Sequence, residues 1–182
     1  MTPPSRHRSA SVEQLQIEHR RRLVAHWMIA PGSRVLEIGC GQGDLTEVLA
    51  EAVGPHGEVL AIDAGSRDEG APITLGAATD ALVHGPLGPR IRFQFECDLL
   101  DAALPPHSFD VVAMGHAAWY FASEAALRET LAVAAGLGPR LVLAEWDLEP
   151  RVLEQTPHLL AVLIQGVVGE RHANVRTPLT TA

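Results

Sequence analysis

The sequence contains no lysine, so arginine supplies all 14 of its permanently basic side chains. Its 22 acidic residues outnumber them, and the formal net charge at pH 7 is -8. A protein that holds nucleic acid through phosphate contacts needs a basic face. The shortage of positive charge therefore argues against a nucleic-acid partner.

Cysteines and long apolar runs are also scarce. Cys40 and Cys97 are too few for a disulfide framework or a zinc pattern, so a reducing compartment is the default. The longest apolar run, residues 159–168, is interrupted by a Gln-Gly pair and is too short to span a bilayer. Residues 1–30 lack the apolar segment of a secretory signal. We therefore expect a soluble, cytoplasmic protein with no membrane partner and no metal site.

The length and composition predict one globular domain. A composition of 47% hydrophobic and 20% charged residues is typical of a globular protein. The length of 182 residues is enough for one hydrophobic core but too short for two well-formed ones. Residues 1–10 combine proline, serine and arginine, which predicts a disordered tail. Residues 11–182 are expected to form the single domain.

The chain is organised around residues 34–44, which read RVLEIGCGQGD. The apolar run predicts a buried strand, and the glycines at 39, 41 and 43 allow positive φ and the close approach of a ligand. Asp44 and Glu47 form a D-x-x-E version of the capping box, so Asp44 is predicted to be the N-cap of a helix. A strand, a glycine turn and a helix N-terminus together indicate a nucleotide site, although such a turn can also have a purely structural role.

The spacing of the glycines distinguishes between kinds of nucleotide. The dinucleotide fingerprint G-x-G-x-x-G places a third glycine where this chain has Asp44. A carboxylate at that position would repel a pyrophosphate and would suit a ligand that has no phosphates and carries positive charge. A nicotinamide-dependent oxidoreductase is therefore disfavoured.

Strand and helix patterns alternate along the rest of the chain. They predict an α/β protein with a Rossmann-like, doubly wound parallel sheet, strand order 3-2-1-4-5 and helices on both faces. Further strands are predicted at 58–62, 90–95, 109–114 and 140–145, and further helices at 11–29, 74–84, 123–135 (with Ser123 as N-cap) and 157–168.

Two residues at strand ends are candidates for ligand contacts. Asp63 ends the second strand about twenty residues after the glycine turn, where a ribose presents its hydroxyls. His116 follows the fourth strand, and a neutral imidazole there can remove a proton from a hydroxyl acceptor. The alternatives are that Asp63 only ends the strand and that His116 only lines the pocket. Trp119 and Tyr120 are expected to serve packing more than chemistry.

The segments VLEIGCGQGDLT (35–46) and PPHSFDVV (105–112) resemble the class I methyltransferases that use S-adenosylmethionine, of the small-molecule type. The resemblance implies in-line methyl transfer to a small-molecule acceptor, with S-adenosylhomocysteine as product. It also implies an adenine contact from Asp98, with Asp101 as its rival, and Glu37 near the amino group of the cofactor or holding the glycine loop. A non-methylating S-adenosylmethionine-binding protein remains the main alternative. The implied cofactor-binding residues are Glu37, Gly39, Cys40, Gly41, Asp63, Ala64, Asp98, Leu99 and Gly115, with His116 as the catalytic candidate.

The chain departs from this family at its C-terminal end. Such methyltransferases typically add a helix and an antiparallel hairpin after the fifth strand, and this chain stops where that unit would begin. We expect either a fragment or a fifth strand left as an exposed edge, which invites pairing with another chain. The helix at 157–168 is apolar on nearly every side, so it should be buried or cover something apolar. A homo-oligomer through the edge strand or this helix is the partner prediction.

Overall fold

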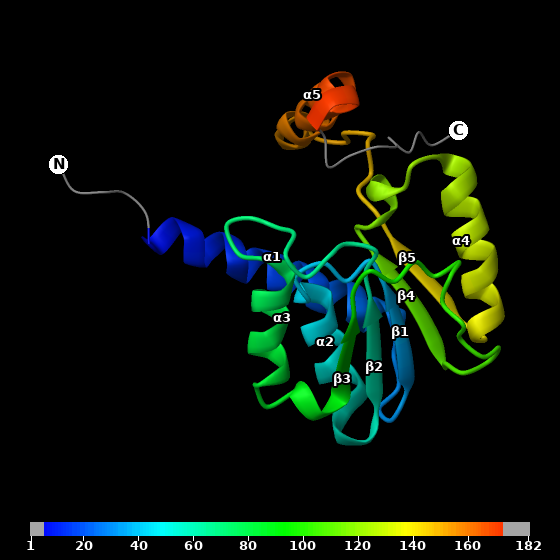
Figure 1. Cartoon of the computed structure of the whole chain (residues 1–182). Helices are drawn as coiled ribbons and strands as arrows, with labels where there is room; N and C mark the ends of the chain where they lie inside the picture. Colours follow the sequence, from blue (N-terminus) through cyan, green and yellow to red (C-terminus); the bar gives the residue numbers. More distant parts are fainter. Residues whose placement is uncertain (1–5, 173–182) are drawn as a thin grey trace.

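The structure is a computed structural model that describes residues 6–172, and it describes side-chain surroundings for residues 14–164. Its centre is a five-stranded sheet in which every neighbouring pair of strands is parallel. The order β3-β2-β1-β4-β5 confirms the predicted topology (Figure 1). The strands are β1 (Arg34–Ile38), β2 (Glu58–Ile62), β3 (Ile91–Gln94), β4 (Val111–Gly115) and β5 (Leu141–Ala144).

Helices cover both faces of the sheet, as predicted. Figure 1 shows α1, α2 and α3 on one face and α4 on the other, while α5 lies beyond the carboxyl ends of the strands. Ser123 caps α4 by accepting a hydrogen bond from Ala126 N, so this predicted cap is confirmed. The described α-helices are α1 (Arg6–Trp27), α2 (Asp44–Val53), α3 (Leu75–Val83), α4 (Glu124–Leu137) and α5 (Thr156–His172), with short 3-10 turns η1 (Gly54–His56), η2 (Gly88–Arg90), η3 (Ala118–Tyr120) and η4 (Leu153–Gln155).

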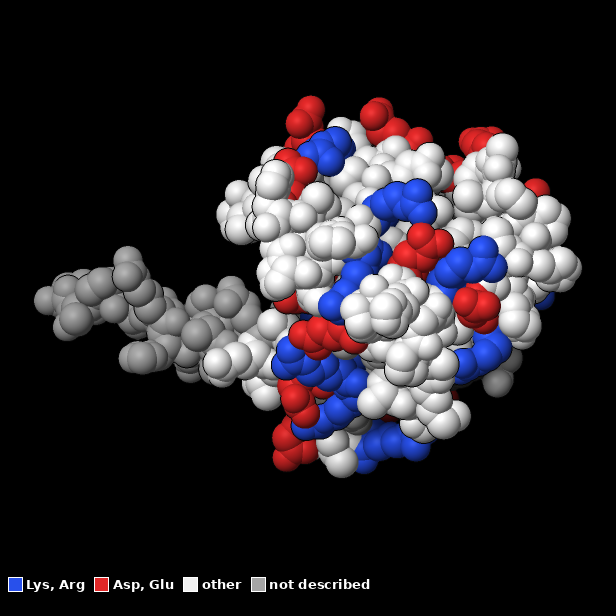
Figure 2. Space-filling view, turned by 90° about the horizontal axis from the view of Figure 1, so that it is seen from below, with Lys and Arg blue, Asp and Glu red and all other residues white. Residues whose placement is uncertain are grey.

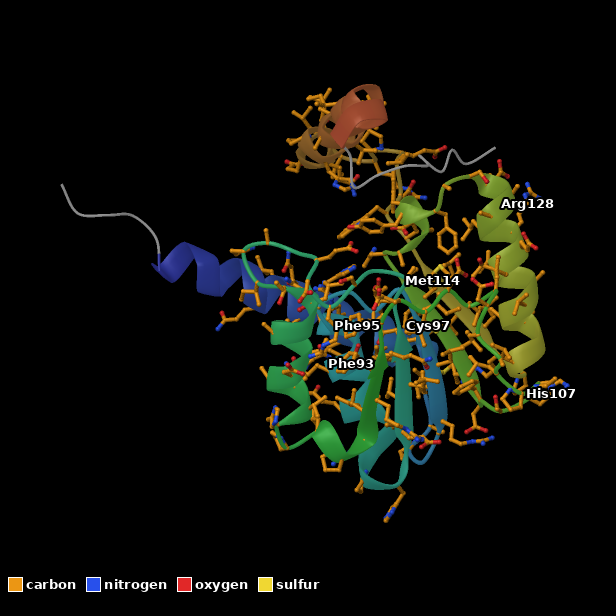
Figure 3. All side chains as sticks on the ribbon, in the orientation of Figure 1. Phe93, Phe95, Cys97, His107, Met114 and Arg128 are labelled. Atoms are coloured by element: carbon orange, nitrogen blue, oxygen red, sulfur yellow. The ribbon has the colours of Figure 1, made fainter. Side chains whose placement is uncertain are left out.

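Two apolar clusters lie on opposite faces of the sheet. Successive residues of β1 point to opposite sides, so Val35 packs with α1 and α2, and Leu36 packs with α4. Both side chains are fully buried, as expected for a parallel strand that is covered on each face. Cys97 and Met114 belong to the second cluster, and Figure 3 shows them inside the domain, away from the outward-facing Arg128.

The start of α2 differs from the prediction. The N-cap is Gly43, at φ 87, with no side-chain capping bond, so the prediction that Asp44 caps the helix is wrong. Because the chain enters α2 through a left-handed glycine, Glu47 N bonds to Gly43 O and Asp44 becomes the first helical residue. The Asp44 carboxylate instead pairs with Arg20 of α1, at 2.9 Å.

The outer helices also differ from their predicted bounds. Helix α1 begins at Arg6 rather than Ser11, so part of the segment predicted as a tail is helical. Helix α5 begins at Thr156 and is not buried within the described chain. Only Val162 of its described side chains is buried, whereas Leu163 and Ile164 are 53% and 62% exposed. That this helix covers something apolar stays a prediction.

The charged surface is mixed on the face that Figure 2 shows. Arginine side chains and carboxylates lie interspersed there. Among the described helices, none combines the length and apolar character that crossing a membrane requires.

Candidate nucleotide site

The glycine turn after β1 requires glycine for two different reasons. Gly39 and Gly41 have φ values of 75 and 52, which side-chain-bearing residues rarely adopt. A Cβ on Gly39 would also lie 2.5 Å from Ala117 Cβ, so no larger residue fits there. At Gly41 an added Cβ would meet nothing within 4 Å, which leaves open space beside the backbone of the turn. The turn can therefore admit a ligand close to its backbone.

Asp63 connects this turn to the end of β2. Its Oδ2 accepts a hydrogen bond from Gly41 N and its Oδ1 accepts one from Gly65 N, both at 2.8 Å. A carboxylate oxygen has a second lone pair, so each can still accept a bond from a ligand hydroxyl. Ala64 follows as an exposed residue at the same edge. The structure thus brings the predicted ribose residue next to the glycine turn, and it gives Asp63 a role in holding the turn that the sequence did not show.

Glu37 lies at the buried centre of β1 and is 1% exposed. Thr46 Oγ1 of α2 donates a hydrogen bond to Glu37 Oε2 at 2.6 Å. Burial raises the pKa of Glu37 to about 8, and the Asp63 charge adds to this, while the Thr46 hydrogen bond lowers it. Glu37 is therefore largely protonated at neutral pH without a cationic partner, and a nearby ammonium group would favour its ionised form.

The turn after β3 lies beside Asp63. Cys97 N donates to Asp63 O at 3.0 Å, and Asp98 follows with an exposed side chain. Asp98 Oδ1 accepts a bond from Leu100 N at 2.9 Å, which fixes the carboxylate at the sheet edge. Leu99 is 3% exposed and packs in the second apolar cluster, so it offers little surface to a ligand. The rival Asp101 is exposed in the same turn.

Cys40 and Gly115, two further residues predicted for the cofactor site, offer no reactive groups. Cys40 is 6% exposed and makes no disulfide, and burial raises the pKa of its thiol, so the thiol stays protonated. Gly115 ends β4, where an added Cβ would lie 2.6 Å from Leu45 Cδ2. A side chain at 115 would force the Leu45 side chain of α2 to move.

His116 adopts φ 58, a left-handed conformation that costs about 1–3 kcal/mol for a residue with a side chain. Its ring stacks on Trp146 with centroids 4.3 Å apart. His116 Nε2 lies 3.0 Å from His19 Nε2, and His116 Nδ1 lies 3.5 Å from Glu145 Oε1. His116 is therefore enclosed by α1 and the segment after β5 rather than open to a ligand on both sides.

Sequence reasoning missed the neighbours of His116. Glu145 and Trp146 follow β5, so the rule that parallel strands end at one edge would have placed them near the site. His19 lies on α1 among arginines and glutamates, and no local sequence signal shows that it reaches β4. Arg20, beside it, joins α1 to the glycine turn through Asp44.

The aromatic residues of η3 behave differently from each other. Trp119 is 4% exposed, which supports the predicted packing role, although its Nε1 has no hydrogen-bond partner. Tyr120 is 59% exposed and does not pack in the core. The predicted packing role therefore fits Trp119 better than Tyr120.

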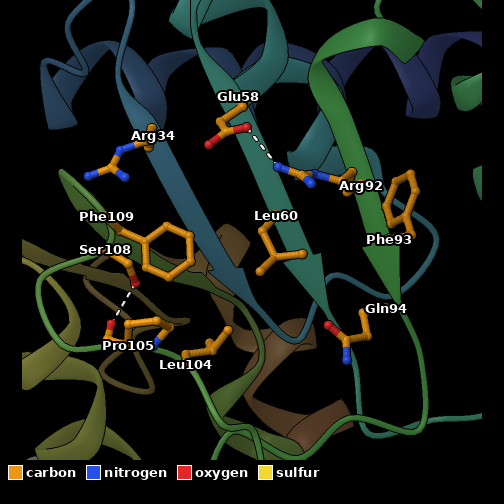
Figure 4. Close-up of a pocket in the computed structure, with 10 residues that line it drawn as sticks. All are labelled: Arg34, Glu58, Leu60, Arg92, Phe93, Gln94, Leu104, Pro105, Ser108 and Phe109. Carbon is orange, nitrogen blue, oxygen red and sulfur yellow. Dashed lines mark hydrogen bonds and ion pairs between the residues drawn. The ribbon is translucent and has the colours of Figure 1, made fainter.

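A hollow of about 470 Å³ lies elsewhere on the sheet (Figure 4). It is lined by residues such as Arg34 and Glu58, which begin β1 and β2, and by Leu60, Arg92 and Phe109. None of the predicted site residues lines it, so it is separate from the glycine turn. In the part of the chain that the structure describes, no group of three or more His, Cys, Asp or Glu is placed to hold a metal ion.

The fold and the site define a Rossmann-like domain whose glycine turn is flanked by the carboxylates of Asp44 and Asp63, the first of them paired with Arg20. The family described as "Methyltransferase domain" matches residues 35–138, and the chain belongs to this family. Membership in the family implies S-adenosylmethionine as the cofactor.

Similar proteins carry methyltransferase names. Methyltransferase phomM' of Diaporthe leptostromiformis is 29% identical over 167 residues, covering 80% of this chain and 42% of that protein. Demethylmenaquinone methyltransferase of Staphylococcus aureus is 32% identical over 98 residues, covering 53% of this chain and 36% of that protein. The chain thus spans less than half the length of these relatives.

A solved structure extends the similarity over nearly the whole chain. The cyclopropane-fatty-acyl-phospholipid synthase-like protein of Lactobacillus casei is 39% identical, with a TM-score of 0.85, over 99% of this chain and 68% of that one. Geranyl diphosphate C-methyltransferase of Streptomyces coelicolor, 14% identical with a TM-score of 0.55 over 71% of this chain and 44% of that one, shares the fold alone.

The residues present fit the implied cofactor. The open space at Gly41 admits a ligand, and the carboxylates of Asp63 and Asp98 are acceptors for hydroxyl and amino groups. Arg20, the arginine that reaches this turn, is paired with Asp44 and is not free for a phosphate. The donor and acceptor set therefore suits a cationic nucleoside without phosphates.

Proposed function

We propose that this domain catalyses methyl transfer from S-adenosylmethionine to a small-molecule acceptor by direct in-line displacement. The observation that carries the proposal is the carboxylate-rich glycine turn, in which Asp63 bonds to Gly41 N and Asp44 stands where a dinucleotide site has glycine. The matching family supports the same assignment.

Each predicted residue has a role in this proposal. Gly39 and Gly41 let the cofactor approach the backbone, Asp63 accepts the two ribose hydroxyls, and Asp98 accepts the adenine amino group. Glu37 either faces the cofactor's ammonium group or holds the turn through Thr46. The cofactor, when bound, supplies an electrophilic methyl group on a sulfonium. The remaining lining residues of the proposed cofactor site are Cys40, Ala64, Leu99 and Gly115.

The protein's contribution is chiefly positioning, because no covalent enzyme intermediate is needed. Holding acceptor and methyl group in line can supply about 7–11 kcal/mol of barrier reduction. The side chains near the carboxyl ends of β4 and β5 include exposed Tyr120 and Trp146, and α5 beyond them carries exposed Leu160. These surfaces favour an acceptor with apolar or aromatic character.

Replacing Asp63 by Asn tests the cofactor site. The variant loses charge-assisted hydrogen bonds worth about 1.5–3 kcal/mol, so affinity for S-adenosylhomocysteine should fall by roughly 10- to 100-fold in calorimetric titration. Asp68→Asn is the matched control, since Asp68 is exposed on the following loop and no hydrogen bond or ion pair is found for its side chain. Equal affinities in Asp63→Asn, Asp68→Asn and the unmodified protein, with all three folded by circular dichroism, would contradict the proposed role.

A further inference from the structure

Two imidazole rings meet at the mouth of the site. His19 Nε2 of α1 lies 3.0 Å from His116 Nε2, and both side chains are partly buried. At this distance one nitrogen must donate a proton and the other must accept it. The pair therefore has two possible arrangements, which differ in which ring keeps its Nδ1 unprotonated.

Glu145 selects between these arrangements. Its Oε2 accepts a bond from Ala118 N at 3.0 Å and its Oε1 accepts one from Trp146 N at 2.9 Å, so both oxygens act as acceptors in a fixed position. His116 Nδ1 is buried without a hydrogen-bond partner and lies 3.5 Å from Glu145 Oε1. A lone pair on this nitrogen would face carboxylate lone pairs, whereas an N–H would be attracted to them. His116 is therefore protonated at Nδ1.

The tautomer of His116 determines that of His19. With its proton on Nδ1, neutral His116 can only accept at Nε2, so His19 must donate from its own Nε2. Neutral His19 then has an unprotonated Nδ1. Of the unpartnered polar side-chain atoms in residues 14–164, the buried ones are His116 Nδ1 and Trp119 Nε1. His19 Nδ1, for which no partner is found either, is therefore not fully buried.

We propose that His19, rather than His116, is the base that takes a proton from the acceptor, and that the acceptor reacts through a protic atom such as a hydroxyl oxygen. His116 and Glu145 are positioning residues, because they act on the acceptor only through the tautomer of His19. This inference rests on the proposed methyl transfer.

The proton and electron balance of the step is simple. The O–H bond of the acceptor breaks and its proton bonds to His19 Nδ1. The oxygen forms a bond to the methyl carbon, and the pair of electrons from the broken C–S bond stays on sulfur. Protonated His19 keeps its Nε2–H bond to His116, whose Nδ1–H faces the Glu145 carboxylate, so the positive charge forms next to a fixed negative one.

The surroundings of His19 keep it neutral before the step. Burial lowers its pKa, and the charges of His116, Arg20 and Arg22 lower it further. On the facing elements, Glu145 lies beyond His116, and the ring of His158 of α5 lies tilted against Trp146, which stacks on His19. A neutral imidazole at neutral pH is the form that a general base requires.

Nitrogen NMR of the full chain without ligand tests the assignment directly. Long-range spectra of the imidazole nitrogens at neutral pH should show His116 protonated at Nδ1 and His19 protonated at Nε2. His19→Gln and His116→Gln assign the signals, and His26→Gln, an exposed histidine on the same helix, is the control that should leave both unchanged. His19 protonated at Nδ1 would overturn the proposal.

Glu145→Gln tests the positioning role. The variant removes the negative charge that favours an N–H at His116 Nδ1, so His116 should shift toward its Nε2–H form and His19 toward Nδ1–H. If Glu145 had only a structural role, its replacement would leave the tautomers of His116 and His19 unchanged. Unchanged His19 nitrogen signals in a folded Glu145→Gln variant would therefore contradict the positioning role of Glu145.

Cofactor binding separates this inference from the proposed function. Titration with S-adenosylhomocysteine should give the same affinity for His19→Gln, His26→Gln and the unmodified protein, because His19 is assigned to the acceptor. Failure of the unmodified protein to bind would contradict the proposed function and the base role that rests on it, whereas the tautomer assignment, which is measured without ligand, would stand. A loss of binding confined to His19→Gln would place His19 in the cofactor site and overturn its assignment as acceptor base.

Discussion

Glu37 shows how one buried carboxyl can make the stability of the whole domain depend on pH. Its pKa is about 8 in the folded protein, mainly because of burial, against an ordinary value of 4.5. Because the folded pKa is raised, its contribution to stability is fully present below about pH 4.5. That contribution is lost as the pH rises through about 8.

Replacing Glu37 by Gln should remove this dependence, since the amide is uncharged at every pH. We expect the free energy of unfolding of Glu37→Gln to exceed that of the unmodified protein by a few kcal/mol at about pH 9, since each pKa unit corresponds to about 1.36 kcal/mol. The two should converge toward about pH 5. Urea unfolding at a series of pH values measures this difference in the free energy of unfolding.

Glu154→Gln is the control for this measurement, because Glu154 is exposed on η4. The free energy of unfolding of Glu154→Gln should change with pH as that of the unmodified protein does. Parallel curves for Glu37→Gln and the unmodified protein would show that Glu37 ionises in the folded state as it does in the unfolded chain.

The sequence predicts the position of a single residue well when that residue directly follows a strand. Asp63, Asp98 and His116 were placed at one edge because parallel strands end together. Their contacts were not predictable in the same way. The bond from Gly41 N to Asp63 and the pairing of His19 with His116 depend on packing between segments distant in the chain. The Asp44 cap failed because a left-handed glycine enters the helix one residue earlier.

At the scale of elements, β5 is one of the two edges of the described sheet, opposite β3. It pairs with β4 alone, and its side chains Leu141 and Leu143 are 37% and 44% exposed. An edge with unpaired backbone groups and apolar side chains favours association with another chain.

We predict concentration-dependent self-association of this chain in sedimentation equilibrium. Leu143→Glu should reduce it, because a charge on the edge strand opposes strand pairing. Val133→Glu is the matched control, since Val133 is a similarly exposed apolar residue on α4, at 39%. A monomer at every concentration, or equal loss of association in both variants, would contradict a role for the edge.

Element prediction was accurate for the strands because apolar runs bounded by glycine and proline carry a local signal. The ends of α1 and the exposure of α5 were not predictable, because both depend on what the helices pack against. The apolar composition of α5 indicates burial, yet most of its described side chains face outward. Composition shows that a helix needs an apolar partner without showing where that partner is.

At the scale of the whole molecule, the fold, the family and the site converge on a cationic nucleoside. The sheet order and the glycine turn are shared by dinucleotide enzymes, so neither alone decides the ligand. Asp44 argues against a dinucleotide, because it puts negative charge where a pyrophosphate would lie. Asp63 does not discriminate, since dinucleotide enzymes also place an acidic residue there for the ribose. The function therefore depends on which ligand binds this turn.

Calorimetric titration of the unmodified chain with S-adenosylhomocysteine and, separately, with NAD identifies this ligand. We predict saturable binding of S-adenosylhomocysteine with one site per chain and no measurable binding of NAD. Binding of NAD without binding of S-adenosylhomocysteine would contradict the account.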